Sequence, residues 1–264
     1  MIKLLSIILL TLLLLIGGKR GLKTFFAIYV NLFLLMILVI ITGWGFSPTI
    51  PTLIICIIIS TIILFFLNGV NKKTIASFIS VILILVLFTI ITLLLGKNIM
   101  IKGYSEETID GIGWLVYNTG LNMLAISNSV LLIGMIGTIN DTSIAISSAL
   151  YEVHDNNPKL TPKELFKSGM NIGKDILGTT TNTLFFAYLG GFMSLFIYFI
   201  DFKFNFTGII NSKIFGIEFA KMMLGGASSI LIIPLTSFIT TIFCKIDSID
   251  KEKLYEKIRH RIRG

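Results

Sequence analysis

Asp141 is the residue whose type and position could do the most chemistry in this sequence, because it is a carboxylate within an apolar stretch. The residues around it, 130–149, are typical of a membrane-spanning helix. A charged side chain at the centre of a bilayer costs about 3 kcal/mol on insertion scales, so it normally faces a protein interior or a water-filled path. A carboxylate in such a place can exchange a proton or an ion. Asp141 is therefore the first functional candidate.

A stripe of small residues follows the helix face of Asp141, at spacings of three, four and seven residues. The stripe consists of Gly134, Gly137, Ala145 and Ser148. Small side chains let the backbone of a second helix approach closely. We therefore expect helix packing at this stripe, with Asp141 inside the contact and away from lipid. Asn140 and Thr142 flank the carboxylate and are expected to add hydrogen-bonding groups beside it.

The next predicted spanning helix carries a second polar patch near its start. The patch consists of Asp175, Thr179, Thr181, Asn182 and Thr183. Two interpretations are open. These groups could line or gate a polar path together with Asp141. They could instead bond to neighbouring helices, which contributes roughly 0.6 to 2 kcal/mol for each hydrogen bond.

Intramembrane catalysis is a further hypothesis, because Asp141 and Asp175 on neighbouring helices could share a proton as paired carboxylates do. The Gly-x-Gly-Asp sequence of intramembrane aspartyl proteases is absent, as are a His-Glu-x-x-His metal helix and a Gly-x-Ser-x-Gly elbow. Cys56 and Cys244 lie in or beside different apolar runs and have no metal-ligand spacing. We expect no catalytic residue, no metal and no cofactor, and hence no enzyme.

The elements that position these residues are expected to be membrane helices. Hydrophobic residues make up 55% of the chain and charged residues 14%, whereas a soluble domain is about a quarter charged. The apolar runs are continuous rather than alternating, which favours an all-α, polytopic helix bundle over a barrel. About seven transmembrane helices are predicted within one domain, 1–244. They cover about 2–17, 25–43, 50–68, 74–95, 122–149, 178–200 and 226–244.

The distribution of basic residues predicts the orientation of the bundle. Of the 22 lysines and arginines, 16 fall in one set of loops and the C-terminal segment, and six fall on the other side. The excess of positive charge marks the cytoplasmic side, so the N-terminus is expected outside and the basic tail 245–264 inside. The net charge of +8 is explained by these short loops, so we expect the lipid bilayer as a partner and no nucleic acid. Between two spans, Thr161, Pro162 and Glu164 predict the start of a separate helix on the inner membrane surface.

A long pattern in residues 134–191 resembles the YibE/F-like family of bacterial membrane proteins. The matching segments are 136–152, 157–161, 164–184 and 187–191. The rest of the chain matches that family mainly in hydropathy. The family comprises longer proteins with an outer soluble domain and shorter, membrane-only proteins, and this chain resembles the shorter kind. The resemblance implies a multi-pass protein of the bacterial cell membrane, with a longer companion or a second copy of itself as a possible partner.

The order of motifs is also similar to the SecF half of the SecD/SecF translocation motor, of the proton-driven RND class. The similarity consists of Asn140, Asp141 and Thr142 in a helix, then a cytoplasmic connection, then a Thr-rich helix start. It implies that these polar residues serve proton passage. The large outer domain of that class is not expected here, and Lys174 and Asp175 stand near the place of an expected arginine.

Three functions are therefore open. The first is a transport or export component, proton-coupled through Asp141. The second is a non-catalytic membrane partner that anchors a longer companion. The third is the intramembrane enzyme already described, which the missing motifs disfavour.

Overall fold

The computed structural model describes residues 1–98 and 123–263, and within them every regular element is a helix. In chain order they are α1 (Ile2–Gly43), α2 (Thr49–Thr61), the π-helical turn η1 (Ile62–Phe66), α3 (Lys72–Asn98), α5 (Met123–Asn156), α6 (Pro162–Gly191), α7 (Met193–Asp201), α8 (Phe206–Asn211) and α9 (Lys213–Arg263). The predicted all-α class is confirmed.

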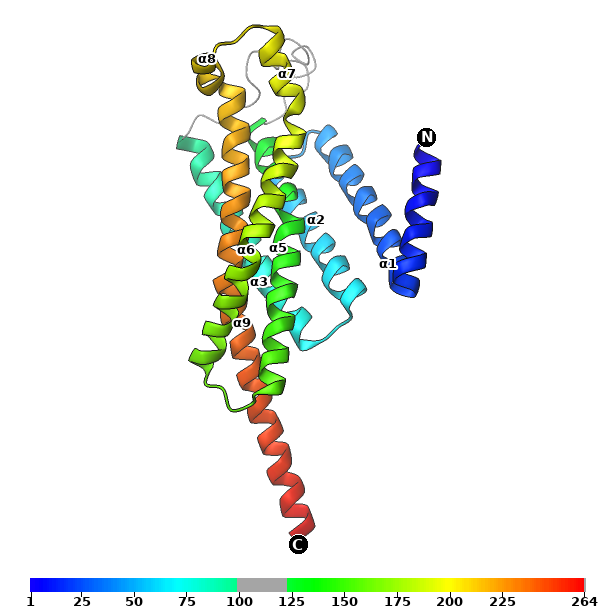
Figure 1. Cartoon of the computed structure of the whole chain (residues 1–264), viewed down its shortest axis with the longest axis vertical. Coiled ribbons are helices and arrows are strands. Elements are labelled where there is room, and N and C mark those ends of the chain that lie inside the picture. The colour runs from blue at the N-terminus through cyan, green and yellow to red at the C-terminus, as the bar shows by residue number, and fades with distance from the viewer. Residues whose placement is uncertain (99–122, 264) are drawn as a thin grey trace.

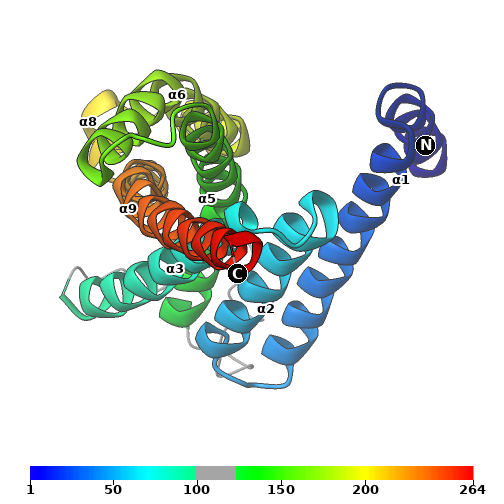
Figure 2. The same cartoon turned by 90° about the horizontal axis from the view of Figure 1, so that it is seen from below.

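The main bundle is formed by α3, α5, α6 and α9. α5, α6 and α9 run along the long axis of the molecule, and α3 crosses behind them at an angle (Figure 1). α9 packs against each of the other three helices. α2 lies against α5, and α1 lies outside α2, as the end-on view shows (Figure 2). α7 and α8 sit at one end of the bundle, and the last part of α9 extends beyond the opposite end (Figure 1). The best-buried apolar side chains include Val81, Leu85, Leu132, Ile139 and Ile232.

Five described helices are long and apolar enough to cross a membrane, and a sixth is added if α6 and α7 form one bent span. The five are Lys3–Gly43, Thr49–Phe66, Lys72–Leu94, Ala125–Asn156 and Glu218–Ile246. A helix needs about 20 residues to cross the hydrocarbon, so the chain is a multi-pass membrane protein. The count of about seven spans and the orientation stay predictions, and the difference in count arises in α1.

α1 contains both of the predicted segments 2–17 and 25–43. Gly18 separates them, because its backbone angles of φ 52° and ψ −129° are not helical and suit glycine. The Tyr29 hydroxyl donates a hydrogen bond to Ser6 Oγ at 2.6 Å, although a straight helix would hold these residues about 35 Å apart. α1 therefore folds back on itself into two arms (Figure 1).

The predicted capping of α6 is confirmed. The Thr161 N–H donates to Glu164 Oε2 at 2.8 Å, and the Glu164 N–H donates to the Thr161 hydroxyl at 3.4 Å. The prediction of a separate surface helix is wrong, because α6 continues from Pro162 to Gly191 without a break. The predicted span 178–200 is instead divided after Gly191, where the chain bends by 46° into α7. The basic tail 245–264 continues the α9 helix to Arg263.

Glycines in α6 allow α9 to approach closely. A Cβ atom added at Gly173 would overlap the Ile233 side chain, and one at Gly169 would lie 2.6 Å from Ser237 Oγ. The same atom at Gly169 would lie 2.8 Å from the Leu150 side chain, so α5, α6 and α9 meet at this point. Small residues at such contacts are typical of helices that associate within lipid.

Candidate functional site

Asp141 lies at the middle of the candidate span Ala125–Asn156. Its side chain is exposed on the side of the bundle. Within the described residues, no hydrogen bond or ion pair joins its carboxylate to another group. The expectation that Asp141 lies inside a helix–helix contact of this chain is therefore wrong for this structure.

Asn140 and Thr142 do not form hydrogen bonds with the Asp141 side chain. Asn140 is fully buried on another face of α5, where its side-chain amide donates to Ser60 Oγ of α2 at 3.1 Å and to the Ile136 carbonyl at 2.9 Å. Thr142 is buried, and its hydroxyl has no hydrogen-bond partner in the described part of the chain. The physical reason is that successive helical residues point in different directions and do not face one another.

The small-residue stripe packs against another helix only in part. The phenol oxygen of Tyr188 from α6 lies against Gly134, where a Cβ atom would overlap it. A Cβ atom added at Gly137 would have no atom of another residue within 4 Å, and Ala145 is exposed. Ser148 is half-buried and lines a cavity described below. The predicted helix packing is thus seen at Gly134 and is wrong for Gly137 and Ala145.

The polar patch of α6 is divided in the same way. Asp175, Thr179 and Asn182 are exposed, whereas Thr181 is half-buried with a hydroxyl that finds no partner among the described residues. Thr179 and Thr183 donate to backbone carbonyls of α6 itself, at 2.9 and 2.8 Å. In the described structure, no hydrogen bond joins this patch to Asp141.

The interhelical hydrogen bonds of α5 lie on a face that the sequence interpretation missed. Ser143 and Ser77 exchange hydrogen bonds with each other's backbone carbonyls at 3.1 and 3.2 Å, which joins α5 to α3. The Ser147 hydroxyl donates to the Lys73 carbonyl at 2.8 Å. Asn140, Ser143 and Ser147 are spaced by three and four residues, so this stripe was visible in the sequence.

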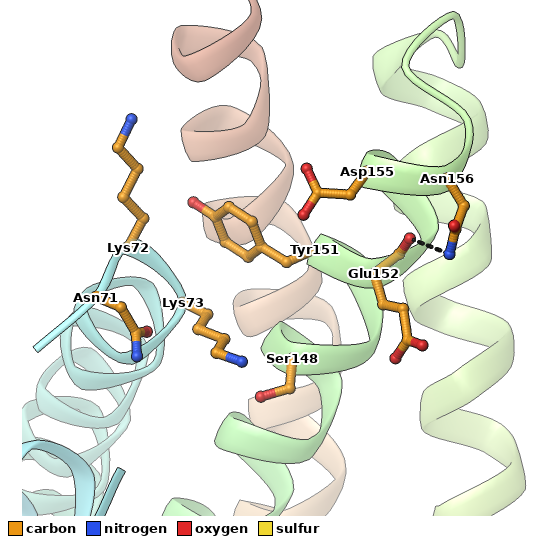
Figure 3. Close-up of a pocket in the computed structure, with 8 residues that line it drawn as sticks. All are labelled: Asn71, Lys72, Lys73, Ser148, Tyr151, Glu152, Asp155 and Asn156. Carbon is orange, nitrogen blue, oxygen red and sulfur yellow. Dashed lines mark hydrogen bonds between the residues drawn. The ribbon is translucent and has the colours of Figure 1, made fainter. Parts of the chain in front are cut away.

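A polar cavity of about 560 Å³ lies where α3 begins and α5 ends (Figure 3). It is lined by Asn71, Lys72, Lys73, Ser148, Tyr151, Glu152, Asp155 and Asn156. Positive charge therefore comes from the start of α3 and negative charge from the last turns of α5. Within the described residues, no hydrogen bond or ion pair involves the Lys73 ammonium or the Glu152 carboxylate.

The carboxylates and histidines of the described chain do not gather into a metal centre. No group of three or more His, Cys, Asp or Glu residues there is arranged to hold a metal ion. Cys56 and Cys244 are buried and not joined by a disulfide.

Comparison with known proteins adds one finding. The family described as YibE/F-like protein matches residues 5–246, so the match extends well beyond the block 134–191 noted in the sequence. Comparison with curated proteins and with solved structures gives no match. The family match covers most of the chain, including Asp141, α6 and the charged cavity. The chain therefore belongs to the YibE/F-like family.

Proposed function

We propose that this chain is one subunit of a membrane transport or export assembly, in which Asp141 handles a proton or an ion at the contact with a second membrane polypeptide. The observation that carries the proposal is the exposed, unpartnered carboxylate at the middle of a candidate span. A charge facing hydrocarbon costs about 3 kcal/mol on insertion scales, so this face of α5 needs a polar or proteinaceous neighbour. The role is non-enzymatic.

The surroundings of Asp141 support a subunit contact. Gly137 and Ala145 lie on the same exposed face of α5, and neither carries a side chain larger than a methyl group. A helix of a longer YibE/F-like companion or of a second copy could therefore approach the α5 backbone closely. The second polypeptide would then surround the carboxylate, where protonation could be linked to movement between subunits.

Cross-linking tests the subunit contact. In a chain whose two native cysteines are replaced by serine, Gly137→Cys is labelled in native membranes with a maleimide that carries a photoreactive benzophenone. On illumination, the benzophenone should insert into a C–H bond of a second polypeptide. Phe238→Cys is the matched control, because Phe238 is 57% exposed on a different helix, α9. Mass spectrometry of the product identifies the companion or a second copy. Equal cross-linking at both positions, or none at position 137, contradicts the contact.

Proton flux tests the role of Asp141. The assembly that cross-linking identifies is purified without cross-linker and reconstituted into vesicles with a trapped pH-sensitive dye. An imposed potential drives proton entry. Asp141→Asn should reduce entry by tenfold or more, on the order of what removal of an essential proton-carrying group costs. Asp201→Asn is the control, because Asp201 is an exposed carboxylate at the end of α7 and outside the predicted polar path. Unchanged proton flux in the Asp141→Asn variant contradicts the proposed role of Asp141 in proton handling.

The anchoring function is the second candidate, and one observation favours it. The hydroxyls of Thr179 and Thr183 bond within α6 itself, so the described chain does not by itself supply a hydrogen-bonded path from Asp141. If the chain only anchors a companion, Asp141→Asn should leave both the stoichiometry of the assembly and its flux unchanged. Lost assembly with the same variant would instead assign Asp141 to subunit recognition.

A further inference from the structure

We propose that the charged cavity between α3 and α5 binds the headgroup of a phospholipid that carries both a phosphate and a primary ammonium, as phosphatidylethanolamine does. The proposal does not depend on Asp141. It rests on the position of the cavity, on the separation of charges across it and on its size.

The cavity lies where a headgroup would lie. Its residues are the first ones of the candidate span Lys72–Leu94 and the last turns of the candidate span Ala125–Asn156. The ends of spanning helices meet the headgroup region, whichever side of the membrane they face. A volume of about 560 Å³ lies within the range of small-ligand sites, about 300 to 1,000 Å³.

The wall formed by the start of α3 suits a phosphate. The Lys73 side chain extends from α3 toward α5, at the level of Ser148 (Figure 3). Lys72 also lines the cavity, and its side chain points away from Ser148 (Figure 3). The Asn71 side chain caps α3 by accepting the Thr74 N–H at 2.9 Å, so the positive end of the helix dipole points to this wall.

The opposite wall suits an ammonium group. Glu152 and Asp155 lie three residues apart near the end of α5 and both line the cavity. The negative end of the α5 dipole adds to their field. A phosphate alone would be repelled by the Glu152 carboxylate, and a cation alone by the Lys73 ammonium. A headgroup with both charges satisfies the two walls together, and its glycerol end can remain in the bilayer.

Binding is measured on the purified full chain in detergent by native mass spectrometry, with three lipids of identical acyl chains. Phosphatidylethanolamine should bind about tenfold more tightly than phosphatidylglycerol, which has no cation, since charged hydrogen bonds contribute on this scale. Phosphatidylcholine should also bind less well, because its quaternary ammonium has no N–H to donate. Soluble phosphoethanolamine distinguishes a headgroup site from a free-phosphate site, since it should compete only weakly.

Two variants test which wall of the cavity binds the ammonium and which binds the phosphate. Glu152→Gln should bring the affinities for phosphatidylethanolamine and phosphatidylglycerol to within about twofold of each other. Lys73→Gln should weaken the binding of all three lipids, whereas Lys163→Gln, an exposed α6 lysine outside the cavity, should not.

Equal affinities for the three lipids in the unaltered protein overturn the proposal without any variant. A preference for phosphatidylethanolamine that survives in Glu152→Gln and Lys73→Gln overturns it as well. If soluble phosphoethanolamine competes as strongly as the lipid, the ligand of the cavity is a free phosphate ester and the lipid proposal is wrong. If either variant does not fold, the affinities of the three lipids for the unaltered chain still test the proposal.

Discussion

Asn140 and Asp141 are adjacent in the sequence, but their side chains have opposite surroundings. Asn140 is fully buried and bonded to Ser60, whereas Asp141 is exposed and has no bonded partner in the described chain. The angle of about 100° between successive residues of an α-helix separates them. The two residues therefore have different roles. Asn140 joins α5 to α2 within one subunit, and Asp141 is available to whatever covers the bundle.

This difference predicts unequal effects on the free energy of unfolding. Asn140→Ala should lower the free energy of unfolding by about 1 to 2 kcal/mol, because Ser60 loses its interhelical partner. Asp141→Asn should change it by less than about 0.5 kcal/mol in the isolated subunit, as surface changes do. Thermal or denaturant unfolding of the purified chain in one detergent measures both. A larger loss in Asp141→Asn than in Asn140→Ala would show that the carboxylate has an internal partner.

At the scale of the elements, the contact between α6 and α9 depends on glycines, which have no side chain to keep the two helices apart. Gly169 and Gly173 let Ser237 and Ile233 approach the α6 backbone. The sequence shows these glycines, yet its hydropathy does not say which helix they face. The prediction of a surface helix at this point is wrong for the same reason, because Leu165, Gly169 and Gly173 are buried within the bundle.

Two glycines of α6 provide a matched comparison. Gly173→Leu should destabilise the fold by about 1 to 3 kcal/mol, because the new side chain overlaps Ile233. Gly178→Leu should be neutral or slightly stabilising, since no atom of another residue lies within 4 Å of its Cβ position and leucine favours the helix. Unfolding in detergent measures both variants. Similar values for the two would contradict the close approach of α6 and α9.

At the scale of the whole molecule, the two arms of α1 decide how many times the chain crosses the membrane. If each arm crosses, the described helices amount to the predicted seven spans, with the bent pair α6 and α7 counted once. The reversal near Gly18 would then lie on the same side as the loop between α5 and α6. Both turns carry lysines, which accumulate on the cytoplasmic side of membranes.

Labelling of single cysteines tests this arrangement in intact cells and in inverted vesicles. The native cysteines are replaced, and Lys19→Cys, Lys159→Cys and Lys203→Cys are compared with a membrane-impermeant maleimide. Residues 19 and 159 should react from the same side, and residue 203 from the other. If residue 19 reacts together with residue 203 instead, the first arm of α1 does not cross.

The sequence by itself determined the helical class, the multi-pass character, the cap at Thr161 and Glu164, and the family. These properties follow from local hydropathy, local hydrogen bonds and residue pattern, which need no knowledge of neighbours. Only the tertiary structure decided that Asp141 is uncovered while Asn140 is buried. It also brought Lys73 and Glu152 to one cavity from positions 79 residues apart. The reason is that periodicity defines the faces of a helix, but the packing of the other helices decides which face is covered.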